Sequence, residues 1–199
     1  NAEYFSYNNE RRNITPYEFI PWILANFATV EEAKAGLKNI NFVDEAFNDK
    51  YRLTPLHWII ADKNEAITVE AGKDGIKDYD NPIGELTNNP PFCEQKFNLN
   101  KYMNLSAKPP KNLFLRDIKL KEYSRGLGAI GLPGDWSSQS RFVRAAFVKE
   151  NSVSSKSETE SVGQFFHILG SVTQIKGCCE VENGKYEITI YSSCCNADK

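Results

Sequence analysis

The segment from Gly126 to Phe147 constrains the fold of this chain more than any other stretch, and it reads GLGAIGLPGDWSSQSRFVRAAF. Its first nine residues contain four glycines and one proline, so the backbone there can adopt positive φ angles and pass close to other groups. A helix capped by Ser137 or Ser138 is expected to follow, and from Phe142 to Val148 every side chain except Arg144 is apolar. The pattern predicts a buried helix that begins at a glycine-rich turn.

Arg141 falls in the first turn of this predicted helix, at the edge of a core. A guanidinium is costly to desolvate unless acceptors are provided, so we expect Arg141 to need a partner that this segment lacks. From the residues alone, two interpretations stay open. The side chain is either a structural ion-pair partner, or it holds a carboxylate or lowers the pKa of a nearby thiol or amine.

The chain has 199 residues, of which 41% are hydrophobic, and this suits one globular domain or a large piece of one. Its formal net charge of -2 gives no basic field, so we expect no nucleic acid partner. No apolar run approaches the roughly eighteen residues that span a bilayer, and we expect no membrane partner. Because the chain starts at Asn1 without a Met and stops at Lys199 after a strand-like run, we expect both ends to be truncated.

The cysteines are odd in number and include two adjacent pairs: Cys93, Cys178, Cys179, Cys194 and Cys195. Adjacent cysteines seldom bond to each other because the ring is strained. The pattern therefore favours reduced thiols in a cytoplasmic protein over a disulfide scaffold. Neither His57 nor His167 has a second ligand at zinc-binding spacing, so we expect no metal and no cofactor.

Two helices are predicted after an N-terminal loop. Thr15 is expected to cap the first, with Pro16 at its first helical position and apolar residues between Phe19 and Phe27 at steps of three and four. Thr29 and Glu32 predict a capping box for the second helix, which follows at once.

Residues 41–55 are expected to be irregular, with the aromatic side chains of Phe47 and Tyr51 among charges. Aromatic residues in a loop either fold back onto the domain or line a pocket for an apolar ligand. The residues alone leave both possibilities open.

Four short strands are predicted at 56–61, 66–70, 75–79 and 83–87, separated by the turn-forming runs DKNE, GKDG and DNP. This spacing predicts an antiparallel meander. His57 lies in the first strand and is expected to be structural, because no Ser or Cys nucleophile signature adjoins it.

Asn88 follows the last of these predicted strands, in the run LTNNPPF. The two prolines stop the strand ladder and leave its end exposed. At that place Asn88 could aim its amide NH₂ group at a developing oxyanion. An Asn before two prolines is also a common turn residue, and both interpretations stay open.

The remaining chain predicts helices over 92–102 and 160–172, and a hairpin that turns at Asn183-Gly184. Cys93 is expected to be a small buried hydrophobic residue in the first of these helices. Residues 104–121 contain two prolines and four lysines and predict a surface excursion.

Five strings resemble the conjugated bile acid hydrolases of the choloylglycine hydrolase family, which also contains penicillin V acylases: LHWIIAD, VEAGKDGIKDYDNPIGELTNNPPF, RGLGAIGLPGDWSSQSRFVRAAF, FFHILGSV and GKYEITIYSSCC. The resemblance covers nearly the whole chain. It implies an α+β fold, an incomplete four-layer αββα sandwich of the N-terminal nucleophile hydrolase type with antiparallel sheets. Residues 1–199 would form a single domain, the central portion of such a hydrolase truncated at both ends.

The resemblance also implies roles for residues at matching positions. Asn88 becomes an oxyanion-hole donor, and Arg141 becomes the guanidinium that supports the nucleophile. Phe47, Tyr51 and Leu56 fall where the family places side chains that contact the steroid. The implied reaction is hydrolysis of glycine- or taurine-conjugated bile salts by a homotetramer in a bacterial cytoplasm.

The family's nucleophile is an N-terminal Cys whose own α-amino group serves as the base, and the chain departs from that pattern. Its first residue is Asn1, and none of its cysteines is N-terminal. We therefore expect the nucleophile to belong to a segment upstream of Asn1, and this polypeptide alone to be inactive. Penicillin V acylase or acyl homoserine lactone acylase activity, and a non-catalytic truncated copy, are the alternatives.

Overall fold

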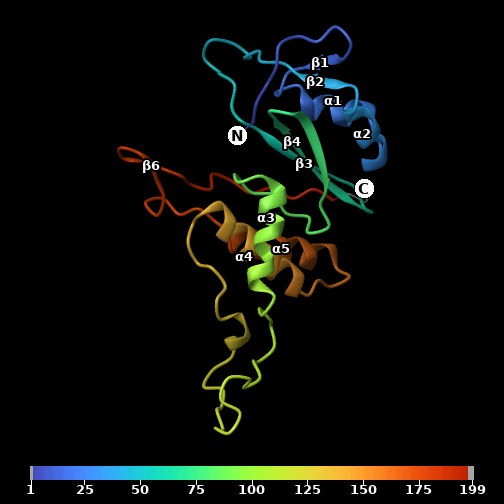
Figure 1. The fold of residues 1–199 in the computed structure, drawn as a ribbon. Coiled ribbons are helices and arrows are strands. Elements are labelled where there is room, and N and C mark those ends of the chain that lie inside the picture. The colour runs from blue at the N-terminus through green and yellow to red at the C-terminus, as the bar shows by residue number, and fades with distance from the viewer. Residues whose placement is uncertain (1, 197–199) are drawn as a thin grey trace. The chain divides into compact units, whose positions relative to one another are not determined.

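The computed structural model describes residues 2–196 and has an α+β fold (Figure 1). The described chain falls into two compact units, one of residues 2–93 with Asn196 and the other of residues 94–195. Among residues 2–196, no helix combines the length and the apolar character needed to cross a membrane.

The first unit begins with two short strands joined by two helices: β1 (Arg12–Ile14), α1 (Phe19–Asn26), α2 (Val30–Leu37) and β2 (Ile40–Phe42). Strands β1 and β2 pair in parallel, with Arg12 opposite Ile40. The two helices return the chain to the start of β1, so that β2 runs in the same direction as β1, which parallel pairing requires. The prediction of antiparallel sheets is therefore wrong for this pair, and the predicted loops before Thr15 and after Ile40 each contain a short strand.

Helix α1 begins at Phe19, three residues after the predicted start at Pro16. The prediction is wrong because Thr15 forms a turn: its backbone N–H and its Oγ1 both donate to Glu18 Oε2, at 3.2 and 2.6 Å. The capping box of α2 is confirmed. Thr29 Oγ1 accepts the Glu32 N–H at 3.2 Å, and the Glu32 carboxylate accepts a backbone N–H one residue before Thr29.

Three of the four predicted strands form an antiparallel sheet in the order β3-β4-β5, with bounds His57–Ala61, Ala66–Gly72 and Gly75–Asp80. The fourth, predicted at 83–87, is wrong, since these described residues form no strand. Asn81 explains the difference. Its Oδ1 accepts the Gly84 N–H at 2.8 Å and its Nδ2 donates to Glu85 O at 2.8 Å, which turns the chain away from the sheet.

The core of the first unit is an aromatic cluster under this sheet. The rings of Phe42 and Trp58 stack with centroids 4.8 Å apart, and Phe19 lies 5.0 Å from Phe42 and 4.7 Å from Trp58. Strand β4 adds three buried side chains to the same cluster: Ile67, Val69 and Ala71. The side chains on one face of β4 are thus buried in the core.

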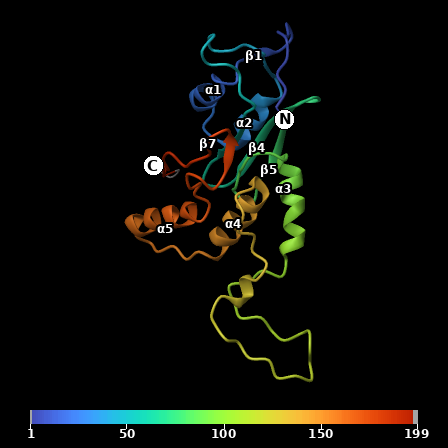
Figure 2. The same cartoon turned by 90° about the vertical axis from the view of Figure 1, so that its left-hand side faces the viewer.

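The second unit contains most of the helices. Helix α3 (Phe92–Asn98) begins at the end of the first unit and continues into the second, followed by 3-10 turns at Leu99–Tyr102 and Leu127–Ala129. Then come α4 (Ser138–Asn151), α5 (Glu158–Gly170) and the hairpin β6 (Glu180–Glu182) with β7 (Lys185–Tyr186). Helices α4 and α5 are in contact, as Figure 2 shows.

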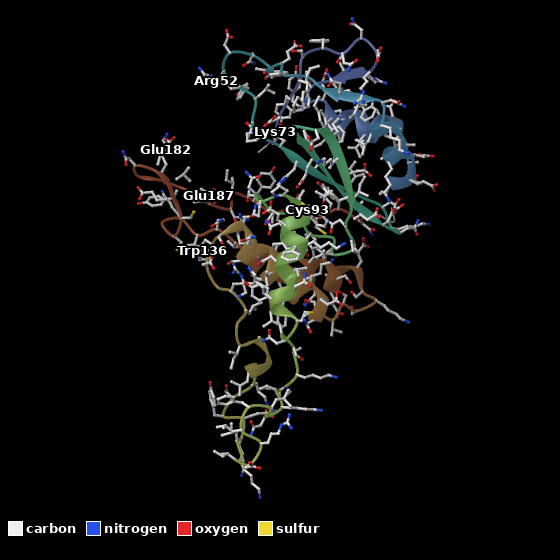
Figure 3. The ribbon with its side chains drawn as sticks, viewed as in Figure 1. Arg52, Lys73, Cys93, Trp136, Glu182 and Glu187 are labelled. Carbon is white, nitrogen blue, oxygen red and sulfur yellow. The ribbon has the colours of Figure 1, made fainter. Side chains whose placement is uncertain are left out.

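Helix α4 is the predicted buried helix, and it is capped by Ser137, whose Oγ accepts the Ser140 N–H. Phe142 and Val143 are buried in it. The hairpin turn at Asn183-Gly184 is also confirmed, with Gly184 at a φ of 75°. The prediction that Cys93 is buried is wrong: this residue, labelled in Figure 3 at the start of α3, is exposed while its neighbour Phe92 is buried.

Residues 104–121 form the predicted surface excursion, which Figure 2 shows as a long loop. Many of its apolar side chains and those just after it are exposed, among them Leu113, Phe114, Leu115, Ile118, Leu120 and Tyr123. Such a concentration of exposed apolar groups is typical of a surface that another protein chain covers.

The aromatic core predicts a sharp contrast between the effects of two side-chain truncations on the stability of this protein. Phe42→Ala removes a ring with no exposed surface and is expected to lower the free energy of unfolding by about 3–5 kcal/mol. Leu24→Ala truncates a side chain that is 77% exposed and is expected to change it by less than about 0.5 kcal/mol. Urea unfolding measures both, and equal effects would contradict this account of the core.

Candidate active-site cleft

A cleft of about 370 Å³ lies in the first unit and receives side chains from all three strands of the antiparallel sheet or the loops beside them. Its lining residues include Leu56, His57, Glu70, Lys77, Tyr79 and Asn88. Side chains alternate between the faces of a strand, so Glu70 points away from the core that its neighbours Val69 and Ala71 enter. Glu70 therefore stands on the face of β4 opposite to the core, while Ala71 belongs to the core and also borders the cleft.

Three ionisable side chains form a row across the sheet in this cleft. Glu70 on β4 is in register with His57 on β3 and with Lys77 on β5. His57 Nδ1 lies 4.0 Å from Glu70 Oε1. Burial lowers the pKa of His57, and the Glu70 carboxylate only partly opposes that effect. Burial therefore disfavours the charged form of His57 and weakens its attraction to the Glu70 carboxylate.

Asn88 lies on the segment after β5, exposed, on the wall of the same cleft. An amide at the edge of a cleft can donate hydrogen bonds to an oxygen atom of a bound molecule. The site therefore has a polar donor on one side and a row of charged and aromatic side chains along the sheet.

Of the three residues expected to contact a steroid, Leu56 lies in this cleft and the other two form a separate cluster. The Leu56 N–H donates to Tyr4 Oη at 2.8 Å, and the Tyr4 hydroxyl donates to Thr54 O at 2.7 Å, which fixes the start of β3. Phe47 and Tyr51, which are 63% and 58% exposed, have ring centroids 6.5 Å apart. The ring of Tyr17 packs edge-on against Phe47 at 5.3 Å.

Arg141 lies in the first turn of α4, half-buried, and belongs to the second unit. Its Nε donates to Trp136 O at 3.1 Å. Trp136, labelled in Figure 3, precedes α4 in the glycine-rich segment. The expectation that this segment lacks a partner for Arg141 is therefore wrong, because a backbone carbonyl five residues earlier supplies one.

The turn that carries Trp136 is held by two further side chains. Asp135 accepts hydrogen bonds from Ser137 N at 2.9 Å and Ser140 Oγ at 2.5 Å, and the hydrogen bonds from these two serines lower the pKa of Asp135 to about 2. Arg144 Nη1 donates to Pro133 O and Arg144 Nε to Ser171 O, both at 2.7 Å. Burial lowers the pKa of Arg144. The hydrogen bonds of Asp135 and Arg144 thus hold the turn next to Arg141 in one conformation.

Sequence reasoning did not predict that His57 and Glu70 line one cleft, or that Tyr4 bonds to the backbone of Leu56. Both Glu70 and His57 are polar residues of predicted strands, which is a signal that sequence reasoning could have used. Their pairing across the sheet, however, depends on the register of the two strands, which the sequence does not give. Tyr4 stands in a segment without any periodic pattern, and no signal in the sequence connects it with residues fifty positions later.

Comparison with known proteins identifies the family. Residues 1–199 match the family described as linear amide C–N hydrolases, choloylglycine hydrolase family. The chain belongs to the choloylglycine hydrolase family.

Two relatives show how far the likeness extends. The chain is 56% identical over 198 residues to the bile salt hydrolase/transferase of Lactiplantibacillus plantarum, a match that covers 100% of this chain and 61% of that protein. A crystal structure of a mutant conjugated bile acid hydrolase from Clostridium perfringens matches with a TM-score of 0.84 and 37% identity, over 94% of this chain and 58% of that one. The chain therefore spans about three fifths of the length of these relatives.

A second structure, penicillin V acylase from Agrobacterium tumefaciens, matches with a TM-score of 0.67 at 23% identity, over 95% of this chain and 51% of that one. At 23% identity this match shows a similar fold and nothing about function. These matches confirm the α+β class and the family that the sequence motifs indicated.

The geometry of the charged row predicts the titration of His57. We expect an imidazole pKa below the ordinary value of 6.5, and a still lower pKa in Glu70→Gln, where the attraction of the carboxylate is lost. With this lowered pKa, the folded protein binds the His57 proton less tightly than the unfolded chain does. The contribution of neutral His57 to the free energy of unfolding is therefore complete above pH 6.5, and it is lost as pH falls through the folded pKa. NMR titration, with His57→Gln for assignment, measures this. A pKa above 6.5 would show that the carboxylate outweighs burial.

Proposed function

We propose that the full-length protein hydrolyses the amide bond of glycine- or taurine-conjugated bile salts and releases a free bile acid and the amino acid. The supporting comparisons are the family membership and the 56% identity to a protein named bile salt hydrolase/transferase. The observation in the structure that carries the proposal is the cleft that the amide of Asn88 and the apolar side chain of Leu56 both line.

We propose that the reaction uses an N-terminal Cys of the full-length protein, the nucleophile that the resemblance to the family implies. The thiol sulfur attacks the amide carbon, and the α-amino group of the same Cys takes the thiol proton. That proton passes to the leaving amine as the C–N bond breaks, and a thioester remains. Water then attacks the thioester, which releases the bile acid and restores the thiol.

Asn88 and Arg141 have distinct roles in this scheme. The Asn88 NH₂ group donates to the oxyanion, and a donor aimed at charge that develops in the transition state raises kcat more than it lowers KM. The Arg141 guanidinium favours the thiolate form of the nucleophile.

We propose that the steroid contacts Phe47, Tyr51 and Leu56. The exposed rings of Phe47 and Tyr51 and the half-exposed side chain of Leu56 offer apolar surface of the kind that a planar steroid covers. The amino-acid part of the conjugate carries a negative charge and points away from this apolar surface.

The wider organisation is also a proposal. We infer that the two units belong to one four-layer αββα hydrolase domain, of which residues 1–199 form the central portion, as the coverage of the relatives supports. We propose a homotetramer, supported by the exposed apolar side chains of the surface excursion. A cytoplasmic location agrees with five free thiols.

Two substitutions test the assigned roles in the full-length protein. Asn88→Ala is expected to lower kcat for glycocholate by about 100-fold to 1,000-fold, because one oxyanion donor is lost. Arg141→Ala is expected to lower kcat/KM by at least about tenfold, because less of the thiol is ionised. Asn64→Ala and Arg11→Ala, at exposed positions, serve as matched controls and should leave both constants unchanged. Normal rates in Asn88→Ala and Arg141→Ala would refute the assignment.

The substrate panel separates the candidate functions. Glycocholate, taurocholate, penicillin V and an acyl homoserine lactone are supplied to the same enzyme at equal concentration. Turnover of the two bile salts at the highest kcat/KM supports the proposal, preference for either of the others assigns an acylase, and no turnover assigns a non-catalytic protein.

The 199-residue polypeptide produced by itself is expected to show no turnover of glycocholate, because its first residue carries an amide in place of a thiol. The full-length protein assayed at the same concentration provides the positive control. Release of glycine by the 199-residue polypeptide would refute the N-terminal Cys mechanism.

A further inference from the structure

The segment between β5 and α3 carries Asn88 and contains neither helix nor strand over residues 81–91. Ladder hydrogen bonds therefore do not fix its position. A donor in an oxyanion site must stay within a fraction of an ångström of its working geometry, so the segment needs anchors of another kind.

The first anchor lies at the start of the segment. Asn81 is 1% exposed, and its Nδ2 donates to Thr68 Oγ1 at 3.0 Å. Thr68 is a fully buried residue of β4, and the Asn81 N–H donates to Ala66 O at 2.9 Å. The segment is thus attached to β4 by both the backbone and the side chain of Asn81.

The second anchor lies at the end of the segment, two residues further along the same face of β4. Glu70 Oε1 accepts the Phe92 N–H at 2.8 Å. The Glu70 side chain is 15% exposed, and Phe92 is buried with its ring 6.1 Å from that of Tyr79. A charged acceptor makes a stronger hydrogen bond to an amide than a neutral one does, and more so away from water.

Two side chains flank Glu70 across the sheet. His57 Nδ1 on β3 lies 4.0 Å from Glu70 Oε1, and Lys77 on β5 is in register with Glu70 while its Nζ pairs with Asp74 at 2.9 Å. The hydrogen bond that Glu70 Oε1 accepts from the Phe92 N–H directs this oxygen at the start of α3.

We propose that Glu70 is a positioning residue for Asn88: its carboxylate anchors the Phe92 amide and so holds the far end of the segment that aims Asn88 into the cleft. The inference rests on the proposed function, because it assumes that Asn88 serves the oxyanion. Glu70 does not contact the substrate in this scheme. It acts through the three residues that join Asn88 to Phe92.

Two uncharged substitutions of similar side-chain length test the hydrogen bond between Glu70 and Phe92 in the full-length protein. Glu70→Gln keeps an oxygen acceptor and is expected to hold kcat for glycocholate within about threefold of wild type. Glu70→Met has no comparable acceptor and is expected to lower kcat by about tenfold to a hundredfold, with KM within about twofold, since a misplaced donor affects the transition state. Asp78→Ala removes an exposed carboxylate from the same sheet and is the control.

A double-mutant cycle separates this inference from the proposed function. If Glu70 acts through Asn88, Glu70→Met in the Asn88→Ala background lowers kcat by no more than about twofold beyond Asn88→Ala alone. Additive losses refute the positioning role and leave the role of Asn88 standing. Normal kcat in Asn88→Ala refutes the proposed function itself.

The thermal midpoint of each variant is measured beside its kinetics. If Glu70→Met does not fold, Glu70→Asp replaces it, since it keeps the charge but is one methylene too short to reach the Phe92 amide. The same loss of kcat at unchanged KM is then expected. A wild-type kcat in whichever of these two variants folds would overturn the proposal.

Discussion

The alternation of side chains along β4 is the constraint on which the first unit depends. In a strand that lies between two others, successive residues must serve opposite faces. Ile67, Val69 and Ala71 complete the aromatic core, while Thr68 and Glu70 stand on the face that holds the cleft and the segment with Asn88. A slip of one residue in the register would exchange these two sets, placing a carboxylate in the core and losing both anchors at once. The stability of the core therefore fixes the geometry of the site.

The same arrangement explains why buried polar groups are tolerated beside this core. Asn81 has less exposed surface than most apolar residues of the unit, and burial of an unpaired amide would cost several kcal/mol. Its Nδ2 and Oδ1 instead satisfy a hydroxyl, a carbonyl and an N–H within the segment and β4. These bonds replace the ladder that a fourth strand would have provided. An irregular segment can thus be as well ordered as a strand when its polar groups are paired.

Sequence reasoning recovered those elements whose signal is local. The capping box at Thr29, the cap at Ser137 and the Asn183-Gly184 turn each depend on residues a few positions apart, and the structure has all three. Strands β1 and β2 were missed because each has three residues and finds its partner 28 positions away, so neither shows a period of its own. The fourth strand was predicted wrongly because residues 83–87 alternate suitably but Asn81 turns the chain first.

The candidate site residues show the same difference between local signals, which sequence reveals, and partners set by packing, which it does not. The family motifs led to Asn88 and Arg141, since both stand in unusual local sequences, and the roles of both stay predictions. What sequence could not supply is the support around them. Thr68 and Glu70 form hydrogen bonds to the two ends of the segment that carries Asn88, and Asp135 and Arg144 form hydrogen bonds within the turn beside Arg141. Thr68 and Glu70 are ordinary residues of a strand, and their partners are set by the packing of that strand. A polar residue placed on an irregular segment gains a fixed direction only through such partners, so the directions of Asn88 and Arg141 depend on residues that no motif identifies.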